Sequence, residues 1–436
     1  MVLGIAITGG GVGDEGKGKV TDYLVHKAST KILHPCLDPE NLPILVERYQ
    51  GGANAGHTVY KDEEELKLHS VPSGIVSPHT FNLMGEKMFI NPRKVYLEIQ
   101  ELREKKVQIS PYNLGISATA HVTLDYHLQE DQEAFRLANH TSTGNGIKQT
   151  SADKQNRTGI RFVEFLDHRL MVYCLKKKFP QGMPGGKSFE EFSHSYDKER
   201  ETLAPYVVQQ QEVRKKHGSH FWFGEGAQGF ALCVDSGFYP GTTSSNPAEP
   251  PRLADYIFSV FKLYFSSVGI GDRPFITQMD LSLEKILRDK WKERGATTGK
   301  DRNLGWFDIP QARYAIDASL IDFLVGTCGD RLQDLHELGI KPKIAVAYRL
   351  GGKTYEAWDI SFHKRNALYE AKPILEEHSS WDRFVLEDGS LHPNAEKFIR
   401  RIEELLGKKF ILMSKGCRRD EIIEYQNPLA LPPRRG

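Results

Sequence analysis

The sequence has few cysteines and no long apolar run, which excludes several classes of protein. Its five cysteines are Cys36, Cys174, Cys233, Cys328 and Cys417, and no two have the Cys-x-x-Cys spacing of zinc and redox sites. An odd, scattered set of thiols is typical of a reducing compartment rather than of a disulfide-stapled secreted domain. No apolar stretch approaches the roughly 20 residues that span a bilayer. We therefore expect a soluble cytoplasmic protein that does not bind membranes.

The sequence also lacks a dominant charge. Its 58 Lys and Arg residues balance 57 Asp and Glu residues, so no overall positive field favours nucleic acid, and any anion site must come from local placement. Residues 1–5 lack the basic segment of a signal peptide and run directly into a glycine-rich loop, so we expect them to begin the first strand. The remaining composition is that of an ordinary globular protein with a large core.

Short apolar runs typical of buried strands recur along the chain, with helix-compatible stretches between many of them. The runs are 3–8, 44–47, 107–110, 221–223, 321–325 and 344–348. This alternation predicts an α/β fold with a large, mostly parallel central sheet and flanking helices. We expect one domain over residues 1–436, in which the Gly-, Pro- and charge-rich segment 176–218 forms a loop and surface helices.

The most informative segment, residues 9–19, reads GGGVGDEGKGK directly after an apolar run. Residues 11–17 have the spacing G-x-x-x-x-G-K, in which backbone N–H groups surround phosphate oxygens and the lysine, here Lys17, neutralises their charge. Gly18 occupies the position where a serine or threonine usually binds Mg²⁺, so the metal needs another oxygen, and Asp14 is the nearest candidate. A carboxylate between phosphate and metal can also accept a proton. The loop is therefore expected to be catalytic as well as nucleotide-binding.

A second glycine-rich loop, RYQGGANAGHT at residues 48–58, follows another apolar run. Its glycines permit close approach of a ligand, and Asn54 offers both a donor and an acceptor. His57 can donate to a developing phosphate charge. A histidine after a turn is more often a surface or capping residue, so the functional interpretation depends on the neighbouring motifs.

Together these two segments resemble the adenylosuccinate synthetase family, whose first loop carries GDEGKGK and whose second carries GGxNAGHT. The resemblance continues in LHSVPSG at 68–74, STGNGI at 142–147, DKQNRTG at 153–159, EGAQG at 225–229, YPGTTSSN at 239–246, TTG at 297–299 with GW at 305–306, and SKGCRR at 414–419. It covers nearly the whole chain. The resemblance implies the fold of that family, similar to P-loop NTPases, with surface elaborations.

The resemblance implies a ligase of purine nucleotide biosynthesis that makes adenylosuccinate from IMP, aspartate and GTP. Asp14 would take the N1 proton of the purine, and O6 would attack the γ-phosphate to form a 6-phosphoryl intermediate that the amine of aspartate displaces. A lactam oxygen is a poor nucleophile until N1 loses its proton, so a nearby carboxylate fits this chemistry. His57 would polarise the transferred phosphoryl group, and Lys17 and Mg²⁺ would share its charge. The family also implies a homodimer, in which Arg157 reaches the phosphate across the interface.

The site residues implied by the resemblance fall into four groups. Catalytic roles belong to Asp14, Lys17 and His57, and the oxygens of Asp14 and Gly56 would bind Mg²⁺. The substrate-binding residues are Asn54, Ser142, Thr143, Arg157, Gln228, Thr243, Thr298, Lys300 and Arg302. The nucleotide-binding residues are Gly13, Glu15, Gly16, Lys17, Gly18, Gly56, Thr58, Asp330, Ser414 and Gly416.

The sequence departs from the family where specificity is determined. The family carries Thr-Lys-Leu-Asp where this chain has TCGD at 327–330, so Asp330 can still accept hydrogen bonds from guanine, but the lysine stem that covers the base is replaced by Cys328. This opens the choice between GTP and ATP. The second departure is in the loop that binds the amino acid in the family, where an arginine-rich run after Thr-Thr-Gly is replaced by KDRN at 300–303. Lys300 and Arg302 still make a cationic site, and Asp301 is expected to cancel part of its positive charge.

Two further departures from the family leave open which purine the pocket binds. Gly-Pro-Ala-Tyr of the family becomes KQTS at 148–151, and Gln-Trp of the first loop becomes Gly11-Val12. A phage relative that acts on a 2-amino purine nucleotide lacks the catalytic aspartate, so the presence of Asp14 argues against that substrate. Two alternatives remain open: the same chemistry with another nucleoside triphosphate, purine or amino acid, and a non-catalytic nucleotide-binding protein. The survival of Asp14, Lys17 and His57 together disfavours the last.

Overall fold

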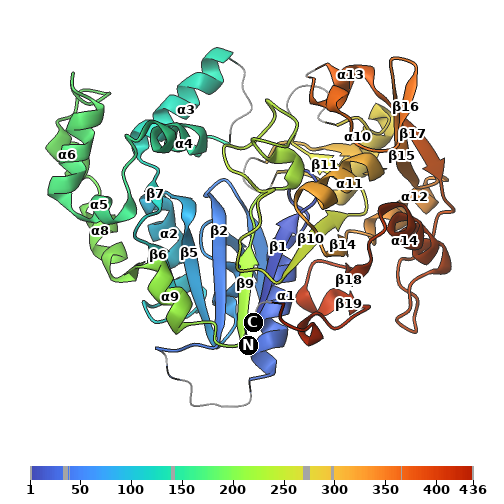
Figure 1. Cartoon of the computed structure of the whole chain (residues 1–436), viewed down its shortest axis with the longest axis horizontal. Coiled ribbons are helices and arrows are strands. Elements are labelled where there is room, and N and C mark those ends of the chain that lie inside the picture. The colour runs from blue at the N-terminus through green and yellow to red at the C-terminus, as the bar shows by residue number, and fades with distance from the viewer. Residues whose placement is uncertain are drawn as a thin grey trace.

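The structure of the chain is a computed structural model that describes residues 2–32, 38, 40–138, 143–268, 275–295, 299–364 and 366–434. Eleven strands form one central sheet (Figure 1). In spatial order they are β19 (Ile422–Glu424), β18 (Phe410–Ser414), β14 (Phe323–Thr327), β10 (Tyr256–Lys262), β1 (Leu3–Gly9), β9 (Phe221–Glu225), β2 (Ile44–Gly52), β5 (Thr80–Ile90), β6 (Leu114–Ser117) and β8 (Val207–Val208), with β7 (His121–Val122) beside β5. Every pairing in this sheet is parallel except that of β18 with β19. The expected α/β fold with a large, mostly parallel sheet is therefore confirmed.

Strand β1 lies in the middle of the sheet and is buried along its whole length. Its Ile5 and Ile7 side chains pack in one apolar cluster with Val20 and Leu24 of helix α1 (Lys17–Thr30). Because strand and helix are joined by the glycine-rich loop, this packing fixes both ends of that loop. The first loop is thus held at the carboxyl end of a central parallel strand, where ligand sites of such sheets collect.

Four of the six apolar runs coincide with or overlap strands of the central sheet, and two do not. The run 344–348 lies in β15 (Lys343–Leu350), which belongs to a separate four-stranded sheet with β13 (Phe307–Asp308), β16 (Lys353–Tyr355) and β17 (Lys372–Glu377). The strand expected at 107–110 was wrong. Val107 and Ile109 are buried against the core beside α2 (Pro92–Glu104), but Ser110 begins a turn closed by Asn113, so this segment pairs with no strand.

The segment 176–218 begins in α6 (His168–Lys178) and continues through α7 (Phe189–His194), α8 (Asp197–Leu203) and α9 (Gln210–Lys216). In Figure 1, α6 and α8 lie to the left of β6, at one end of the sheet. Helices α6, α7 and α8 are amphipathic, because Leu175, Phe192 and Leu203 are buried in the same cluster as the inner face of α2. The assignment of one domain with this segment as an elaboration stays a prediction.

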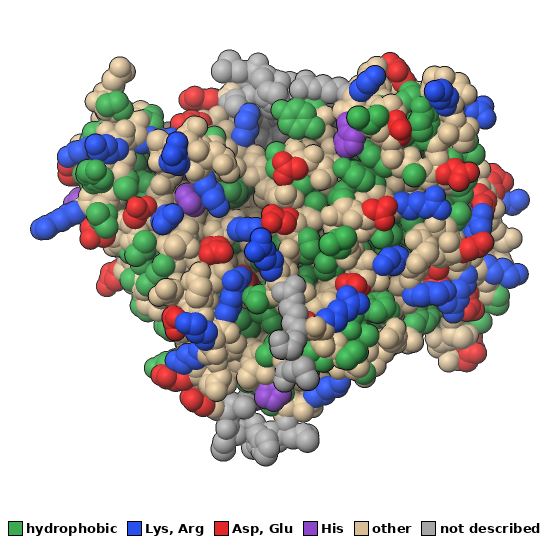
Figure 2. Space-filling view, in the orientation of Figure 1, with side chains coloured by type: hydrophobic (Ala, Val, Ile, Leu, Met, Phe, Trp, Pro, Cys, Tyr) green, Lys and Arg blue, Asp and Glu red, His purple; other side chains and the backbone are tan. Residues whose placement is uncertain are grey.

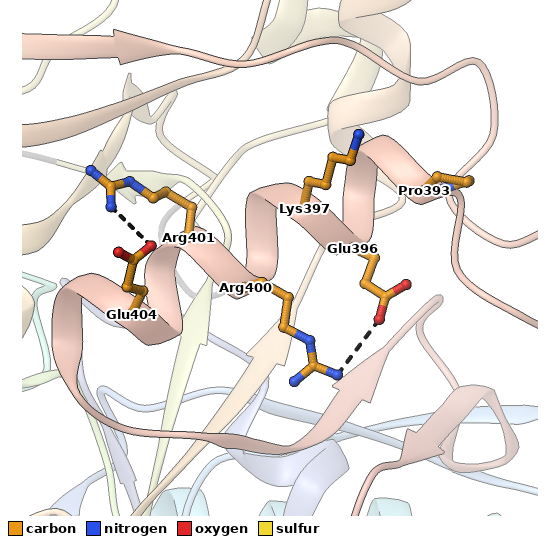
Figure 3. Close-up of a pocket in the computed structure, with 6 residues that line it drawn as sticks. All are labelled: Pro393, Glu396, Lys397, Arg400, Arg401 and Glu404. Atoms are coloured by element: carbon orange, nitrogen blue, oxygen red, sulfur yellow. Dashed lines mark ion pairs between the residues drawn. The ribbon is translucent and has the colours of Figure 1, made fainter.

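The outer face of α14 (Pro393–Leu406) lines a shallow hollow (Figure 3). Arg400 pairs with Glu396 at 3.5 Å and Arg401 with Glu404 at 2.9 Å along the helix. Such exposed pairs each contribute only about 0.3–0.5 kcal/mol, and their charges cancel. None of the described helices is both long enough and apolar enough to cross a membrane.

Candidate functional site

The first loop turns sharply between β1 and α1. Gly13 and Gly16 have φ angles of 98° and 94°, and Asp14 is itself left-handed at 58°. Glycine tolerates this conformation without strain, which explains the glycine spacing of the loop. Glu15 organises its interior, since one carboxylate oxygen accepts hydrogen bonds from the backbone N–H of Gly13 at 2.7 Å and of Gly11 at 3.2 Å.

The expected catalytic lysine lies inside this loop. The Lys17 ammonium binds the second oxygen of Glu15 at 2.6 Å, and both side chains are about 3% exposed. The buried pair leaves no net charge in the loop. An entering phosphate would therefore compete with Glu15 for Lys17.

The Asp14 carboxylate projects from the loop and remains 35% exposed. It forms an ion pair with Arg302, a residue expected to bind the substrate amino acid. The other end of the Arg302 guanidinium binds Glu293 at 2.6 Å. Two of the expected site residues, far apart in the sequence, are thus in direct contact.

Glu293, which the sequence did not single out, gathers several cations. It is about 1% exposed and accepts from Lys262 at 2.8 Å and from Arg331 at 2.5 Å, in addition to Arg302. Burial would raise the pKa of Glu293, but the three cations hold it well below its usual range. Arg331 directly follows Asp330, so Glu293 joins the expected base-reading turn to the expected amino-acid site.

Asp301 does not cancel the charge of Arg302, contrary to the expectation from the sequence. Its carboxylate pairs with Arg288 at 3.4 Å and with Arg294 at 3.3 Å. Residue 301 points away from its neighbour because 294 and 301 form an antiparallel bridge. Lys300 is exposed beside it, and Thr298 lies outside the described residues.

His57 is buried beside the start of α1. Its Nδ1 forms a hydrogen bond with Glu225, whose carboxylate also accepts from the Ser73 backbone N–H at 2.8 Å and from the Ser73 hydroxyl. Burial, with the positive charges of Arg48 and Lys17, lowers the pKa of His57 to about 4. Burial alone would raise the pKa of Glu225, but His57, Arg48 and Ser73 lower it to about 2.

These shifts define the proton positions at neutral pH. Glu225 is ionised and His57 is neutral, so the ring donates its Nδ1 proton to the carboxylate and its Nε2 carries a lone pair. Glu225 was part of a matching motif but received no role from the sequence. Its place at the last position of β9 was the signal that could have found it.

Buried charged side chains support the second loop, residues 48–58. Arg48 is completely buried, and none of its guanidinium nitrogens has a hydrogen-bond partner among the described residues. Glu98 of α2 accepts from the backbone N–H groups of His69 and Ser70 at 2.8 and 2.9 Å, and the His69 ring binds the Ala55 carbonyl at 2.8 Å. Gly56 and Thr58 flank His57 at the start of β3 (His57–Lys61).

Two of the expected substrate-binding residues, Gln228 and Asn54, lie beside or within this loop. Gln228 is left-handed at φ 57°, and both polar atoms of its side chain are buried without a partner among the described residues. Gly51 approaches the same turn so closely that a Cβ there would lie 2.6 Å from the Ala227 Cβ. Asn54 is half-buried one turn further along the loop.

Three of the expected nucleotide-binding residues, Asp330, Ser414 and Gly416, gather around Lys19, which received no role from the sequence. The Lys19 ammonium donates to the Ser414 hydroxyl and to the Gly416 carbonyl, the latter at 2.6 Å. Asp330 and Cys328 lie close enough to oppose the lowering of the Lys19 pKa by burial. The small residue at 329 is a packing requirement, since a Cβ there would lie 2.3 Å from the Phe384 ring.

The segments that carry the expected substrate-binding residues Thr143 and Thr243 meet at one hydrogen bond. The Ser151 hydroxyl of α4 (Ile147–Asn156) donates to the Ser244 carbonyl at 3.1 Å, next to the half-buried Thr243. Thr143 is exposed before the helix, and Ser142 lies outside the described residues. Arg157 follows α4 as its C-cap residue, in a left-handed conformation, and is exposed.

Comparisons with known proteins agree with this arrangement. Residues 6–423 match the family model described as Adenylosuccinate synthetase. The adenylosuccinate synthetase of Caldanaerobacter subterraneus subsp. tengcongensis is 35% identical, over 97% of this chain and 99% of its own. The solved structure of the fully ligated adenylosuccinate synthetase from Plasmodium falciparum is similar with a TM-score of 0.81 and 25% identity, over 97% of this chain and 99% of that chain.

A more distant structure shares the fold alone. The cyanophage S-2L succinoaminodeoxyadenylate synthetase, solved with dGMP and with dATP as an energy donor, has a TM-score of 0.59 and 16% identity over 98% of this chain and 96% of that chain. The full-length matches at higher identity decide the assignment. The chain belongs to the adenylosuccinate synthetase family of ligases, which join IMP and aspartate in purine biosynthesis.

Proposed function

We propose that the chain makes adenylosuccinate with GTP as the phosphoryl donor and with Asp14 as the base that activates IMP. The observation that carries this proposal is the pairing of Asp14 with Arg302, which brings a half-exposed carboxylate of the phosphate loop to the cation expected at the amino-acid site. The base acts on N1 of the purine and the amine of aspartate attacks the adjacent C6, so the two groups are needed side by side.

In the first step Asp14 accepts the N1 proton of IMP, and the negative charge moves to O6. O6 attacks the γ-phosphorus of GTP, the bond to the β–γ bridging oxygen breaks, and GDP leaves. In the second step the amine of aspartate attacks C6, and inorganic phosphate leaves with the bonding electron pair and takes up the proton that the amine loses. Arg302 would hold a carboxylate of aspartate by two-point hydrogen bonding.

His57 would donate from Nε2 to an oxygen of the transferred phosphoryl group. Because its Nδ1 proton is donated to Glu225, a proton on Nε2 makes the ring an imidazolium. The free protein keeps His57 neutral, with a pKa of about 4. We therefore propose that His57 gains its second proton when the phosphate groups bind, since they raise its pKa.

Mg²⁺ fits the donor set of the first two loops, because hard cations prefer carboxylate and carbonyl oxygens. One oxygen of Asp14 pairs with Arg302 and the side chain is partly exposed, so a second carboxylate oxygen is available. Asp14 and the Gly56 carbonyl would hold the ion. When bound, it would neutralise charge on the phosphate oxygens.

Asp330 supports guanine as the base. The residue is half-buried, and its carboxylate forms no hydrogen bond or ion pair with another side chain in the described part of the chain. An ionised carboxylate accepts from guanine N1 and N2, whereas adenine offers no such pair of donors. Burial raises the pKa of Asp330, and a protonated Asp330 would pair with adenine, so ATP is the second candidate.

The assembly proposed is a homodimer. Arg157 is exposed, as a residue that completes the partner's phosphate site would be. A cytoplasmic location, expected from the scattered cysteines, completes the proposal.

The test supplies IMP, aspartate and Mg²⁺ with either GTP or ATP, and measures phosphate release and product mass. Turnover with GTP at least ten times more efficient than with ATP is expected. A preference for ATP would overturn the assignment of Asp330. Asp14→Asn should abolish IMP-dependent phosphate release while nucleotide still binds, whereas Asp62→Asn, an exposed turn residue, should leave it unchanged. Full activity of Asp14→Asn would overturn the proposed base.

A further inference from the structure

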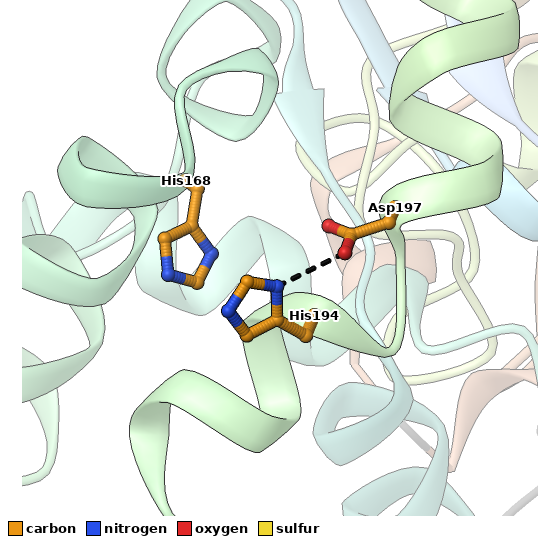
Figure 4. A group of neighbouring side chains, drawn as sticks. All are labelled: His168, His194 and Asp197. Atoms are coloured by element: carbon orange, nitrogen blue, oxygen red, sulfur yellow. Dashed lines mark hydrogen bonds and ion pairs between the residues drawn. The ribbon is translucent and has the colours of Figure 1, made fainter.

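Three side chains that the ligase reaction does not use meet where three helices join. His168 is the first residue of α6, His194 the last of α7 and Asp197 the first of α8 (Figure 4). One possible ligand atom of each lies within 4.8 Å of the others. The His194 Nδ1 and Asp197 carboxylate are 2.9 Å apart, and the two imidazole rings stack with centroids 4.0 Å apart.

The Asp197 carboxylate of this group is held in place by a neighbouring arginine. Arg200 binds the oxygen of Asp197 that His194 does not. Arg200 is itself anchored, since it donates to the Phe165 carbonyl at 2.9 Å and to the Ser193 hydroxyl at 3.1 Å. A carboxylate fixed by an outer hydrogen bond is typical of built metal sites.

The turn between His194 and Asp197 is also rigid. The Ser195 hydroxyl donates to the Phe192 carbonyl at 2.7 Å, and the Tyr196 ring is completely buried. The two side chains therefore leave a fixed backbone on the same side. With the spacing His-x-x-Asp, both side chains can bind one ion without any movement of the helices.

A plain surface ion pair would account for His194 and Asp197 but not for His168. The Nδ1 atom of His168 is buried and has no hydrogen-bond partner among the described residues. A buried polar atom without a partner costs about 1–3 kcal/mol. A cation between the rings and the carboxylate would satisfy this nitrogen.

We propose that His168, His194 and Asp197 bind a zinc ion that clips α6 to α7 and α8. Two imidazoles and one carboxylate suit Zn²⁺ better than Mg²⁺, which prefers oxygen ligands. At Zn–N distances of about 2.0–2.1 Å, tetrahedral ligand atoms lie about 3.4 Å apart. Reaching this geometry from 4.8 Å requires only rotation of side chains, and those of His194 and Asp197 are about 60% exposed.

The clip would stabilise the protein without taking part in the ligase reaction. Helix α6 carries His168 at its first residue and Lys178 at its last, and Lys178 pairs with Asp153 of α4. The zinc ion would therefore fasten the outer helices on which α4 is braced. Its expected effect is on thermal stability, not on turnover.

The experiment titrates Zn²⁺ into the metal-stripped full chain in the presence of excess Mg²⁺, by calorimetry and by thermal denaturation. The wild type should bind one Zn²⁺ with micromolar or tighter Kd and gain several degrees in Tm. His168→Ala/His194→Ala should bind at least tenfold more weakly and lose the gain in Tm. The control is His220→Ala, which removes an exposed histidine from another part of the chain.

A second variant guards against loss of folding in the double substitution. Asp197→Asn keeps the shape of the side chain at the first residue of α8, and should also weaken Zn²⁺ binding at least tenfold. Co²⁺ in place of Zn²⁺ reports the ligand type, because thiolate ligands add an intense near-ultraviolet band that imidazole and carboxylate do not. Absence of Zn²⁺ binding by the wild type, equal binding by the double variant, or a thiolate band would each overturn the proposal.

Discussion

Gly18 and His57 are in direct contact: a Cβ built on Gly18 would lie 2.6 Å from the His57 Cβ. The same Cβ would lie 3.2 Å from the Ser73 hydroxyl, which holds Glu225. The serine or threonine that usually follows the lysine of a G-x-x-x-x-G-K loop therefore has no room here. The missing hydroxyl is explained by the packing of the histidine against the first turn of α1.

Restoring that hydroxyl should damage the enzyme. Gly18→Ser would push His57 away from its position, and a displacement of about 1 Å lowers kcat about 100-fold. Steady-state kinetics at saturating substrates, with circular dichroism to confirm folding, tests this. Thr30→Ala, at the exposed end of the same helix, is the matched control and should retain normal kcat. Wild-type kcat in Gly18→Ser would mean that His57 is not the group that acts on the phosphoryl transfer.

Glu225 should control the proton on His57. Glu225→Gln keeps the side-chain volume but removes the charge that would stabilise an imidazolium, so kcat should fall about 10- to 100-fold. The wild type should take up close to one proton at pH 7.5 when IMP and a non-hydrolysable GTP analogue bind together. Calorimetry in two buffers of different ionisation enthalpy measures this uptake, which Glu225→Gln should lose. No uptake by the wild type would contradict the proposed donation from Nε2.

Arg302 and Asp301, although adjacent, should respond very differently to substitution. Arg302→Leu removes the cation between Asp14 and Glu293, and the KM for aspartate should rise about 10- to 100-fold, as expected for loss of a charged hydrogen bond of 1.5–3 kcal/mol. Asp301→Asn should change it less than threefold, because Asp301 pairs with Arg288 and Arg294. A large fall in the aspartate KM of Asp301→Asn would restore the idea that Asp301 weakens the amino-acid site.

The sequence predicted the parts of the site that are encoded locally. Asp14 and Lys17 lie in a glycine-rich loop whose conformation depends on a few neighbouring residues, and His57 follows another such loop. Their partners could not be predicted. Glu225 is 168 residues from His57, and Arg302 is 288 residues from Asp14, so only the sheet order brings them together.

The fold shows the same division. Strands β1, β2 and β9 each contain a short apolar run and could be recognised. Strand β5 was missed, although it pairs with β2 over most of its length, because the polar residues Asn82, Glu86 and Lys87 interrupt its pattern. Conversely, Val107 and Ile109 have an apolar pattern but cover the end of a helix. Both errors arise because the burial of a residue depends on tertiary packing and not on the local spacing of apolar residues.

Gly329 and Phe384 should behave as a coupled pair next to the base-reading Asp330. Gly329→Leu brings back the leucine of the family but places a Cβ 2.3 Å from the Phe384 ring, so it should destabilise the protein by about 1–3 kcal/mol. Phe384→Ala alone should also destabilise it, whereas the double substitution should recover part of the loss. A double-mutant cycle from urea denaturation measures the coupling. Strictly additive effects would show that Phe384 does not fill the space of the missing side chain.

Asp308 makes the stability of the protein depend on pH in a defined direction. It begins α11 (Ile309–Ala318), where one carboxylate oxygen accepts from Gln311 at 3.1 Å and from the Tyr348 hydroxyl. The other oxygen is buried and has no partner among the described residues. Burial raises the pKa of Asp308 from 3.8 to about 7.

Between pH 3.8 and 7 the folded state therefore keeps a proton on Asp308 that the unfolded chain loses. The free energy of unfolding falls as the pH rises through this window, and the loss from this group is complete above pH 7. Asp308→Asn keeps the helix cap and removes the buried charge. At pH 8 it should be more stable than the wild type by about 1–3 kcal/mol, allowing for the cost of burying the amide. The advantage should disappear by pH 4. Urea denaturation at both pH values, with the exposed Asp317→Asn of the same helix as control, tests this. An Asp308→Asn protein that is no more stable than the wild type at pH 8 would show that the buried carboxylate is compensated in the folded state.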